Sequence, residues 1–196
     1  MELRERPAEK LQGLGGWREG TFVLAGVDAS YARSADRLSL FSDAVVRNKA
    51  WARARLRHAD GRSAQLHCSA RQTTVSLGIA SAAPQPWSVA CTLEDDGRGE
   101  LGLVSEREAA GTREVQRGLW RRNGVTLELR SLHRWEGAVL PSDRPAGYLL
   151  LEAGRPVGAL EANGPNPRVS LPTRGSALRD DVLYAVTALA LLWSPE

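Results

Sequence analysis

The sequence predicts a mainly β fold, with about twelve antiparallel strands forming a barrel or a strongly curved sheet around a C-terminal apolar α-helix. Three observations lead to this fold class: hairpin-type turns in the middle of the chain, segments that alternate apolar and polar residues, and an uncharged run near the end. We expect residues 1–196 to form a single domain, because all-β domains commonly reach about 200–250 residues.

Four two-residue turn signals divide the middle of the chain into candidate strands: Asp60-Gly61, Asp96-Gly97, Asn123-Gly124 and Ala153-Gly154. Asn-Gly and Asp-Gly supply the positive φ angles of tight hairpin turns. Further strands are expected at 21–25, 37–41, 73–79 and 168–171. The segments 13–20, 80–86 and 163–167 are rich in glycine or proline and are expected to be irregular.

The segment 50–57 shows the alternation clearly. Ala52, Ala54 and Leu56 would point to one side of a strand, and the tryptophan and arginines between them to the other. One apolar and one polar face is typical of an antiparallel sheet that is covered on one side.

The uncharged run near the end predicts a buried helix over 177–193. We expect Ser176 to cap it, Asp180 and Asp181 to lie in its first turn, and Pro195 to end it. The twelve residues 182–193 would span about 18 Å as a helix, well short of the ~30 Å hydrocarbon core of a membrane. A membrane span is therefore not expected.

This predicted helix has no polar face. Its polar groups after the aspartates are the Tyr184 phenol and the Thr187 hydroxyl. A helix that is apolar all round must be surrounded, and in a β-rich chain a sheet closed around it achieves this. We therefore expect the helix to lie along the axis of a barrel.

The hairpin pattern at 148–161, followed by a strand and then the helix from Leu178 to Trp193, resembles the end of the tubby C-terminal-like barrels. This superfamily includes tubby domains, phospholipid scramblases and LURP-one-related proteins. The resemblance implies a barrel with an axial helix, and the tubby members bind phosphoinositide headgroups through basic residues. No motif here aligns with their binding site, so the resemblance transfers no site residue.

The first sixteen residues are expected to form an irregular arm. Residues 1–10 are charged and lack the apolar core of a secretory signal, which favours a cytoplasmic protein, at most peripheral to a membrane. Two cysteines in a chain of this length favour buried reduced thiols; a single Cys68–Cys91 bridge is the alternative.

Catalytic and metal-binding motifs are lacking in the sequence. The three histidines have no second pair of ligands at metal-binding spacing, and no nucleophile elbow or phosphate loop is present. The acids Glu94, Asp95 and Asp96 are expected at an exposed hairpin tip, which does not suit acid–base catalysis. The sequence therefore predicts a non-enzymatic protein without cofactor or metal.

The basic residues are 24 arginines and 2 lysines, and several share one predicted strand face. Arg presents a planar donor fork that suits phosphate and carboxylate groups. The candidate anion-binding residues are Arg47, Lys49, Trp51, Arg53, Arg55 and Arg57. The general arginine richness of the chain is the alternative explanation of this row. A second basic group is expected at Arg117, Arg121 and Arg122, beside Trp120.

The function predicted from these residues is a binding module for anionic lipid, with a phospholipid or phosphoinositide-like headgroup as partner; nucleic acid is not favoured. The alternative is a protein-interaction or scaffold domain that uses exposed tryptophans such as Trp17 or Trp135. A ligand-binding barrel is disfavoured, because an axial helix would fill the lumen.

Overall fold

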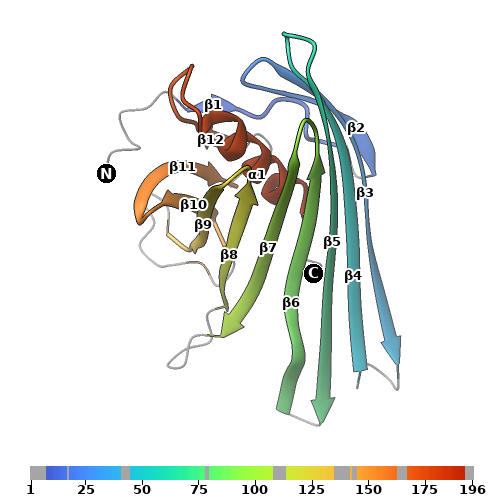
Figure 1. Cartoon of the computed structure of the whole chain (residues 1–196). Coiled ribbons are helices and arrows are strands. Elements are labelled where there is room, and N and C mark those ends of the chain that lie inside the picture. Colours follow the sequence, from blue (N-terminus) through green and yellow to red (C-terminus); the bar gives the residue numbers. More distant parts are fainter. Residues whose placement is uncertain are drawn as a thin grey trace.

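The computed structural model describes residues 8–16, 18–40, 45–77, 80–107, 114–134, 142, 145–162 and 167–192. It confirms the predicted fold class, with twelve antiparallel strands in a nearly closed barrel and one C-terminal helix (Figure 1). The strands are β1 (Glu9–Lys10), β2 (Glu19–Leu24), β3 (Val27–Leu40), β4 (Val45–Arg57), β5 (Ser63–Leu77), β6 (Ala80–Glu94), β7 (Arg98–Arg107), β8 (Glu114–Arg122), β9 (Val125–Leu132), β10 (Gly147–Glu152), β11 (Arg155–Glu161) and β12 (Arg168–Ser170), followed by helix α1 (Arg179–Leu191).

From β2 to β12, each strand pairs with the next one along the chain. The N-terminal strand β1 pairs with the last strand, β12, and Gln12 then forms an isolated bridge with Val23 of β2. Both backbone hydrogen bonds of this bridge are present, at 3.1 and 2.9 Å. The N-terminal segment thus joins the two edges of the sheet, whereas the sequence predicted an irregular arm over residues 1–16.

The hairpin turns follow the predicted dipeptides. Asn123 and Gly124 have φ angles of 47° and 81°, and Ala153 and Gly154 have 48° and 78°. At Asp60-Gly61 only the glycine has a positive φ, and at Asp96-Gly97 neither residue has one. A third turn with positive φ at both residues, Ala25-Gly26, joins β2 to β3. It was not predicted, because Ala25 was expected to lie in a strand over 21–25. The strand expected at 21–25 corresponds to β2, and the strand expected from residue 37 is the end of β3. Because β3 begins at Val27, it is much longer than predicted and pairs with β2 in a hairpin.

The segment 80–86 was predicted to be irregular, and this prediction is wrong. It forms the start of β6 and pairs with β5, which also contains most of the strand expected at 73–79. The register shifts twice here, between Arg71 and Thr73 and between Thr73 and Val75. Such bulges leave positions without a ladder hydrogen bond, and a strand can therefore accommodate Pro84 and Pro86.

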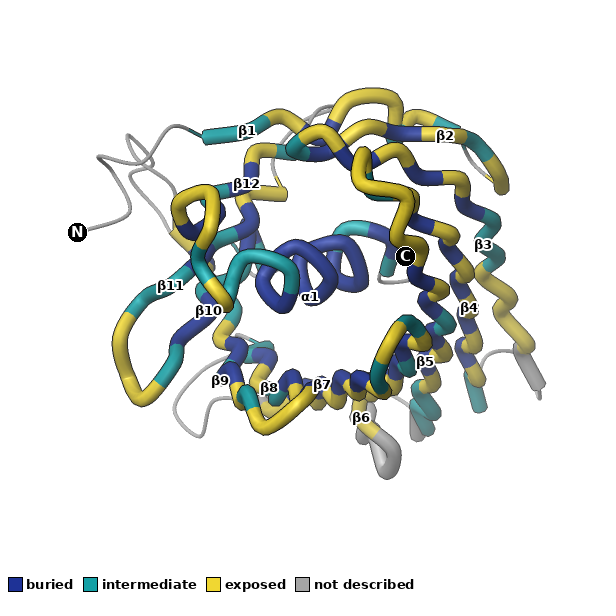
Figure 2. The backbone as a smooth tube through the Cα atoms, turned by 45° about the horizontal axis from the view of Figure 1, so that its top comes forward, coloured by how far each residue is buried: buried dark blue, intermediate teal, exposed yellow. Residues whose placement is uncertain are grey.

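Helix α1 lies inside the ring of strands (Figure 2). Every residue from Asp181 to Leu189 is buried, which confirms that the apolar run forms an enclosed helix. Asp180 and Asp181 lie in its first turn, as predicted. Ser176 is not the cap: Leu178 holds that position, and the Ser176 hydroxyl accepts from the Leu178 N–H at 3.3 Å. Pro195 lies outside the described residues.

The helix approaches the sheet closely at β11. A Cβ atom added to Gly158 would lie 2.4 Å from Cγ1 of Val182, so this position has no room for a side chain. At the opposite wall, Cys68 of β5 and Cys91 of β6 face each other and form a disulfide. The preference for reduced thiols is therefore wrong, because the register places the two cysteines directly opposite each other on the buried face.

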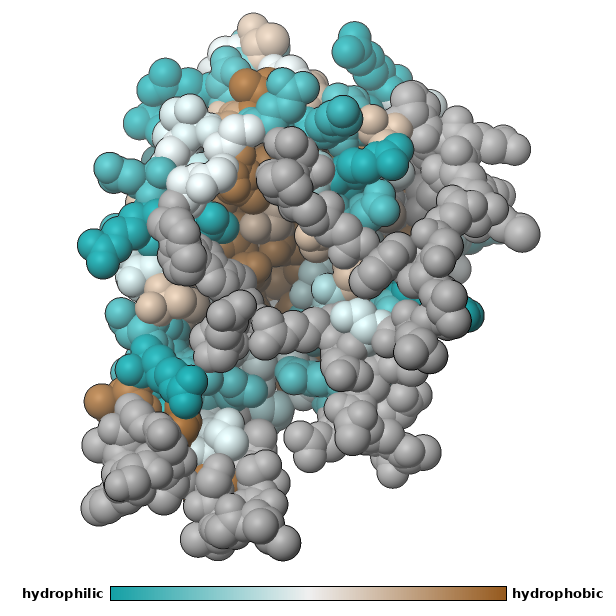
Figure 3. Space-filling view, turned by 180° about the vertical axis from the view of Figure 1, so that it is seen from behind, coloured by the Kyte–Doolittle hydropathy of each residue, from teal (hydrophilic) through white to brown (hydrophobic). Residues whose placement is uncertain are grey.

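The strands β3 to β6 are the longest, and they extend well past the helix at the lower end of Figure 1. The helix consequently fills the upper part of the barrel and not its whole length. Seen from behind, hydrophobic side chains are visible at the bottom of a hollow (Figure 3).

Candidate anion-binding surface

The six predicted anion-binding residues all point outward from β4. Arg47, Lys49, Trp51, Arg53, Arg55 and Arg57 are exposed, and the residues between them from Asn48 to Leu56 are buried. We call these six residues the β4 strip. At about 3.4 Å per residue, the strip is roughly 34 Å long, with side chains about 7 Å apart.

The neighbouring strands determine how open each part of the strip is. At its centre, Arg53 lies between Ala32 of β3 and His67 of β5, and Arg55 lies between Ser30 and Gln65. None of these neighbours carries a carboxylate, and those on β3 are small. The guanidinium groups of Arg53 and Arg55 therefore stand above the surface around them.

Towards the two ends of the strip, acidic residues lie on β3. Asp36 is opposite Lys49, and Asp28 is opposite Arg57. On the other side, Arg71 of β5 is opposite Lys49 and adds a further exposed cation. Among the described residues, no carboxylate lies within ion-pair distance of the cations of the strip. These cations are thus available to an external anion.

Two apolar side chains share the face of the strip. Trp51 is 41% exposed, and Leu38 of β3, which lies opposite Arg47, is 54% exposed. The guanidinium carbon of Arg53 lies 5.5 Å from the centroid of the Trp51 ring. This cation–π contact holds the indole beside the charge, so the surface combines cations with exposed apolar groups.

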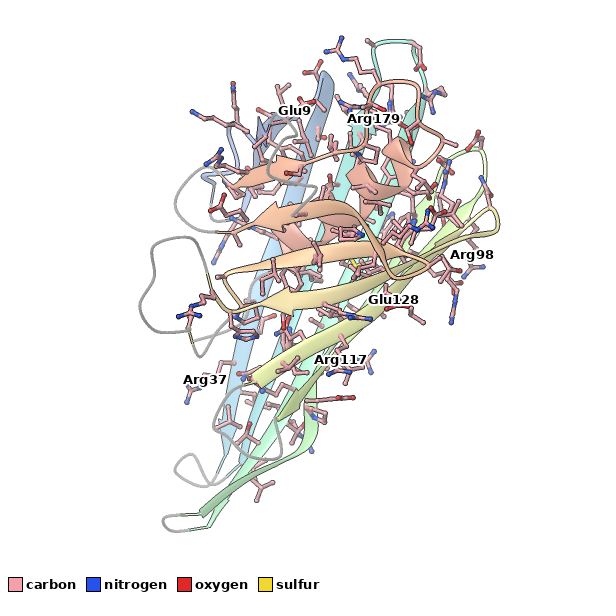
Figure 4. All side chains as sticks on the ribbon, turned by 90° about the vertical axis from the view of Figure 1, so that its left-hand side faces the viewer. Glu9, Arg37, Arg98, Arg117, Glu128 and Arg179 are labelled. Carbon is pink, nitrogen blue, oxygen red and sulfur yellow. A yellow bond between two sulfur atoms is a disulfide. The ribbon has the colours of Figure 1, made fainter. Side chains whose placement is uncertain are left out.

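The second predicted basic group is split by the sheet. Arg117 and Arg121 are exposed on the outer face of β8, whereas Trp120 is fully buried and Arg122 points inward with it. Successive residues on a strand face opposite sides, so Arg122 cannot form one cluster with Arg117 and Arg121. Figure 4 shows Arg98 and Arg117 at the outside of the barrel. The prediction of a single second group is wrong.

Arg122 instead belongs to a buried polar cluster at the first turn of α1. It forms ion pairs with Asp95 and, at 3.0 Å, with Asp96, and its NH1 nitrogen lies 3.6 Å from Asp181. The Asp181 carboxylate accepts a hydrogen bond of 2.9 Å from the Trp120 indole N–H. Asp95 was expected at an exposed tip, but its side chain is only 6% exposed.

Tyr184 completes this cluster. Its ring lies 5.4 Å from the Arg122 guanidinium carbon, and its hydroxyl lies 2.8 Å from Nε2 of His58. Burial raises the pKa of the Tyr184 phenol, and it also raises the pKa of Asp181 against the opposing hydrogen bond from Trp120. The charges of the cluster are paired with one another, so we interpret it as the anchor of the helix N-terminus.

Sequence reasoning missed this cluster because its members come from three hairpins and the helix. The one available signal was Asp181, a carboxylate directly before the apolar run, which needs a partner when the helix is enclosed. No group of three or more His, Cys, Asp or Glu residues suited to a metal occurs among the described residues. The tryptophans Trp17 and Trp135, proposed for a protein interface, lie outside those residues.

Fold and surface together define an antiparallel β-barrel that encloses one helix and carries a basic, tryptophan-bearing outer strand. No family model, curated protein or solved structure matches this chain. In the part of the chain that the structure describes, no helix has the length and apolarity needed to cross a membrane.

Proposed function

We propose that this protein is a non-enzymatic binding module whose β4 strip docks reversibly on an acidic phospholipid surface. The observation that carries the proposal is the pair Arg53 and Arg55, exposed and unpaired between uncharged neighbours, beside the exposed Trp51 ring. Arginine forks bind phosphate oxygens bidentately, and an indole is stabilised where an apolar medium meets water.

The apolar side chains favour a lipid surface over nucleic acid. Leu38 would remain in water beside a phosphodiester backbone, whereas a bilayer interface takes up both leucine and tryptophan. The resemblance to tubby-like barrels is consistent with the same class of ligand, and a relationship to that superfamily is part of this proposal.

Binding of this kind is weak and sensitive to salt. Each Lys or Arg near an acidic membrane surface contributes about 1 kcal/mol, and this contribution falls off within a Debye length. The predicted cytoplasmic, membrane-peripheral location remains a prediction. Disulfides such as Cys68–Cys91 are more common in oxidising compartments. The test of the proposal varies the lipid composition of vesicles, and its outcome does not depend on the compartment in which the protein occurs.

The test is flotation of the full chain with vesicles of phosphatidylcholine alone or mixed with phosphatidylserine or a phosphoinositide. We expect binding to the acidic vesicles only. The triple variant Arg53→Glu, Arg55→Glu, Arg57→Glu should lose at least tenfold in partition, since it reverses three of the five cations of the strip.

The matched control reverses three exposed arginines elsewhere: Arg98→Glu, Arg117→Glu, Arg121→Glu on β7 and β8. Both triple variants change the net charge equally, so only the position of the charges differs. The control variant should retain most of the binding. Equal partition of wild type and strip variant would refute the proposal, as would equal loss in both triple variants.

A further inference from the structure

A cavity of about 290 Å³ lies in the lower part of the barrel, beyond the end of the helix. Its described walls come from five strands, two loops and the last turn of α1. The apolar lining consists of Trp87, Val89, Leu103, Pro145, Leu160, Ala162, Pro167, Leu189, Ala190 and Leu192. The sequence disfavoured a ligand-binding barrel because an axial helix was expected to fill the lumen. The helix does not fill it, so this objection no longer holds.

The cavity has one polar edge, formed by Gln116 of β8 and Tyr148 of β10. The Tyr148 hydroxyl donates to the Gln116 side-chain oxygen at 2.5 Å. The Gln116 amide nitrogen has no hydrogen-bond partner among the described residues, although the residue is only 3% exposed. This edge thus offers a free amide donor and the lone pairs of a phenol oxygen.

A second buried polar group lies beside this edge. Ser105 of β7 is opposite Gln116 in the register and points to the same inner face. It is 2% exposed, and its hydroxyl has no hydrogen-bond partner in the described part of the chain. The Ser105 oxygen is inaccessible and the residue does not line the cavity, so it lies behind the polar edge and does not face a ligand directly.

The position of the polar edge is maintained from behind by a hydrogen-bond chain. The Gln116 backbone N–H donates to the Ser131 hydroxyl at 2.9 Å, and that hydroxyl lies 2.9 Å from Nε2 of His133. The other ring nitrogen of His133 lies 3.0 Å from the Ser142 carbonyl oxygen. Because a carbonyl only accepts, Nδ1 carries the proton and Nε2 accepts from Ser131.

The lining also indicates the charge of the ligand. None of the described lining residues is charged, and the buried Tyr148 phenol stays protonated because burial and then the nearby Glu114 charge raise its pKa. A charged group would lose its hydration in this cavity without gaining a counter-ion. The cavity suits a neutral molecule.

We propose that the lower lumen binds a small neutral apolar molecule with one hydroxyl, carbonyl or amino group, which meets Gln116 and Tyr148 at the polar edge. The volume lies near the lower end of ligand pockets, which begin at about 300 Å³, so the ligand is small. This site is separate from the β4 strip and does not depend on binding of acidic lipid.

The test is a titration of the full chain with 1-aminoanthracene, a compact neutral fluorophore with one amino group whose emission rises in apolar surroundings. We expect saturable binding to wild type. Ala190→Trp places an indole in the cavity and should weaken binding at least tenfold. Ala59→Trp, in the exposed turn between β4 and β5, is the matched control and should bind like wild type.

A second variant keeps the test decisive if Ala190→Trp does not fold. Ala162→Trp lies at the exposed rim of the cavity, where the fold tolerates a larger side chain, and it should also weaken binding tenfold. Unchanged affinity in the folded variants would overturn the proposal. The strip variant Arg53→Glu, Arg55→Glu, Arg57→Glu should bind the fluorophore like wild type; loss there would also overturn it.

Competition defines the class of ligand. Decan-1-ol should displace the fluorophore, and decanoate at neutral pH should be at least tenfold weaker. Gln116→Leu replaces the amide with an apolar side chain of similar size. It should weaken the binding of decan-1-ol about fivefold, which corresponds to the loss of one hydrogen bond. Stronger binding of decanoate, or no effect of Gln116→Leu, would contradict the assignment of a neutral ligand held at the polar edge.

Discussion

The indole N–H of Trp120 donates a 2.9 Å hydrogen bond to the carboxylate of Asp181, and both residues are buried. Trp120 is on the inner face of β8, and Asp181 is in the first turn of the enclosed helix. This bond joins the wall of the barrel to its axis. Together with the Arg122 guanidinium 3.6 Å away, it gives the buried Asp181 carboxylate its partners.

Loss of this bond should destabilise the fold. Trp120→Phe retains most of the ring but removes the donor, and we expect the free energy of unfolding to fall by roughly 2–4 kcal/mol. Denaturant unfolding measures this. In the double variant with Asp181→Ala, which removes the acceptor, the two losses should not add, and the coupling energy should reach about 1 kcal/mol or more. Additive losses would show that the bond contributes nothing.

The pH dependence of stability tests the state of Asp181. Burial raises the pKa of this carboxyl in the folded state, so the folded protein holds the proton more tightly than the unfolded chain. The contribution is then fully present below the unfolded pKa and is lost as the pH rises through the folded pKa. Compared with Asp181→Asn, wild type should gain stability as the pH falls from 7 to 3.

Asp60 supplies a control of opposite sign. The hydrogen bond from the Arg62 side chain lowers the pKa of this exposed carboxyl. Its contribution is present above the unfolded pKa and is lost as the pH falls through the folded pKa. Compared with Asp60→Asn, wild type should therefore lose stability towards pH 3. If both comparisons changed in the same direction, the pKa assignment for Asp181 would be wrong.

The disulfide between Cys68 and Cys91 should stabilise the barrel. The cysteines are 23 residues apart, and closing a loop of this size in the unfolded chain is worth about 3 kcal/mol in the entropic description. The Cys68→Ala, Cys91→Ala variant should unfold at correspondingly lower denaturant concentration. Dithiothreitol should lower the stability of wild type towards this variant and leave the variant unchanged; a variant that still responds would refute the prediction.

The close contact between Gly158 and Val182 predicts a sharp position effect. Gly158→Ala should cost about 1–3 kcal/mol, because the added methyl overlaps Val182 and forces β11 away from the helix. Val182→Ala should remove most of this extra cost when the two are combined. Gly102→Ala on β7, where an added Cβ meets nothing within 4 Å, is the control and should be nearly neutral. Equal costs at the two glycines would contradict the packing described here.

Short-range patterns in the sequence were sufficient for the fold class. The alternation around Ala54 assigns the two faces of β4, and Asn123-Gly124 places a hairpin, because both effects act between neighbouring residues. The lack of a polar face on the helix predicted its enclosure for a similar reason. The outward direction of the β4 strip followed from the same alternation.

Three features depended on tertiary structure. Pairing of β5 with β6 placed Cys68 opposite Cys91, and the register of β4 placed uncharged neighbours beside Arg53 and Arg55. Closure of the barrel brought Asp95 and Asp181 to Arg122, across 27 and 59 positions of the chain. No local pattern predicts contacts of this kind, because they depend on the order of distant strands around the barrel axis.

The sequence by itself thus determined that a β-sheet closes around an apolar helix, since burial of uncharged residues and positive φ turns are properties of short segments. Only the tertiary structure decided where the helix stops relative to the longer strands. That length difference leaves the cavity beside the last turn of the helix, with Gln116 and Tyr148 at its polar edge. The shape of such a cavity depends on the relative lengths and positions of many elements, so no single element of the sequence predicts it.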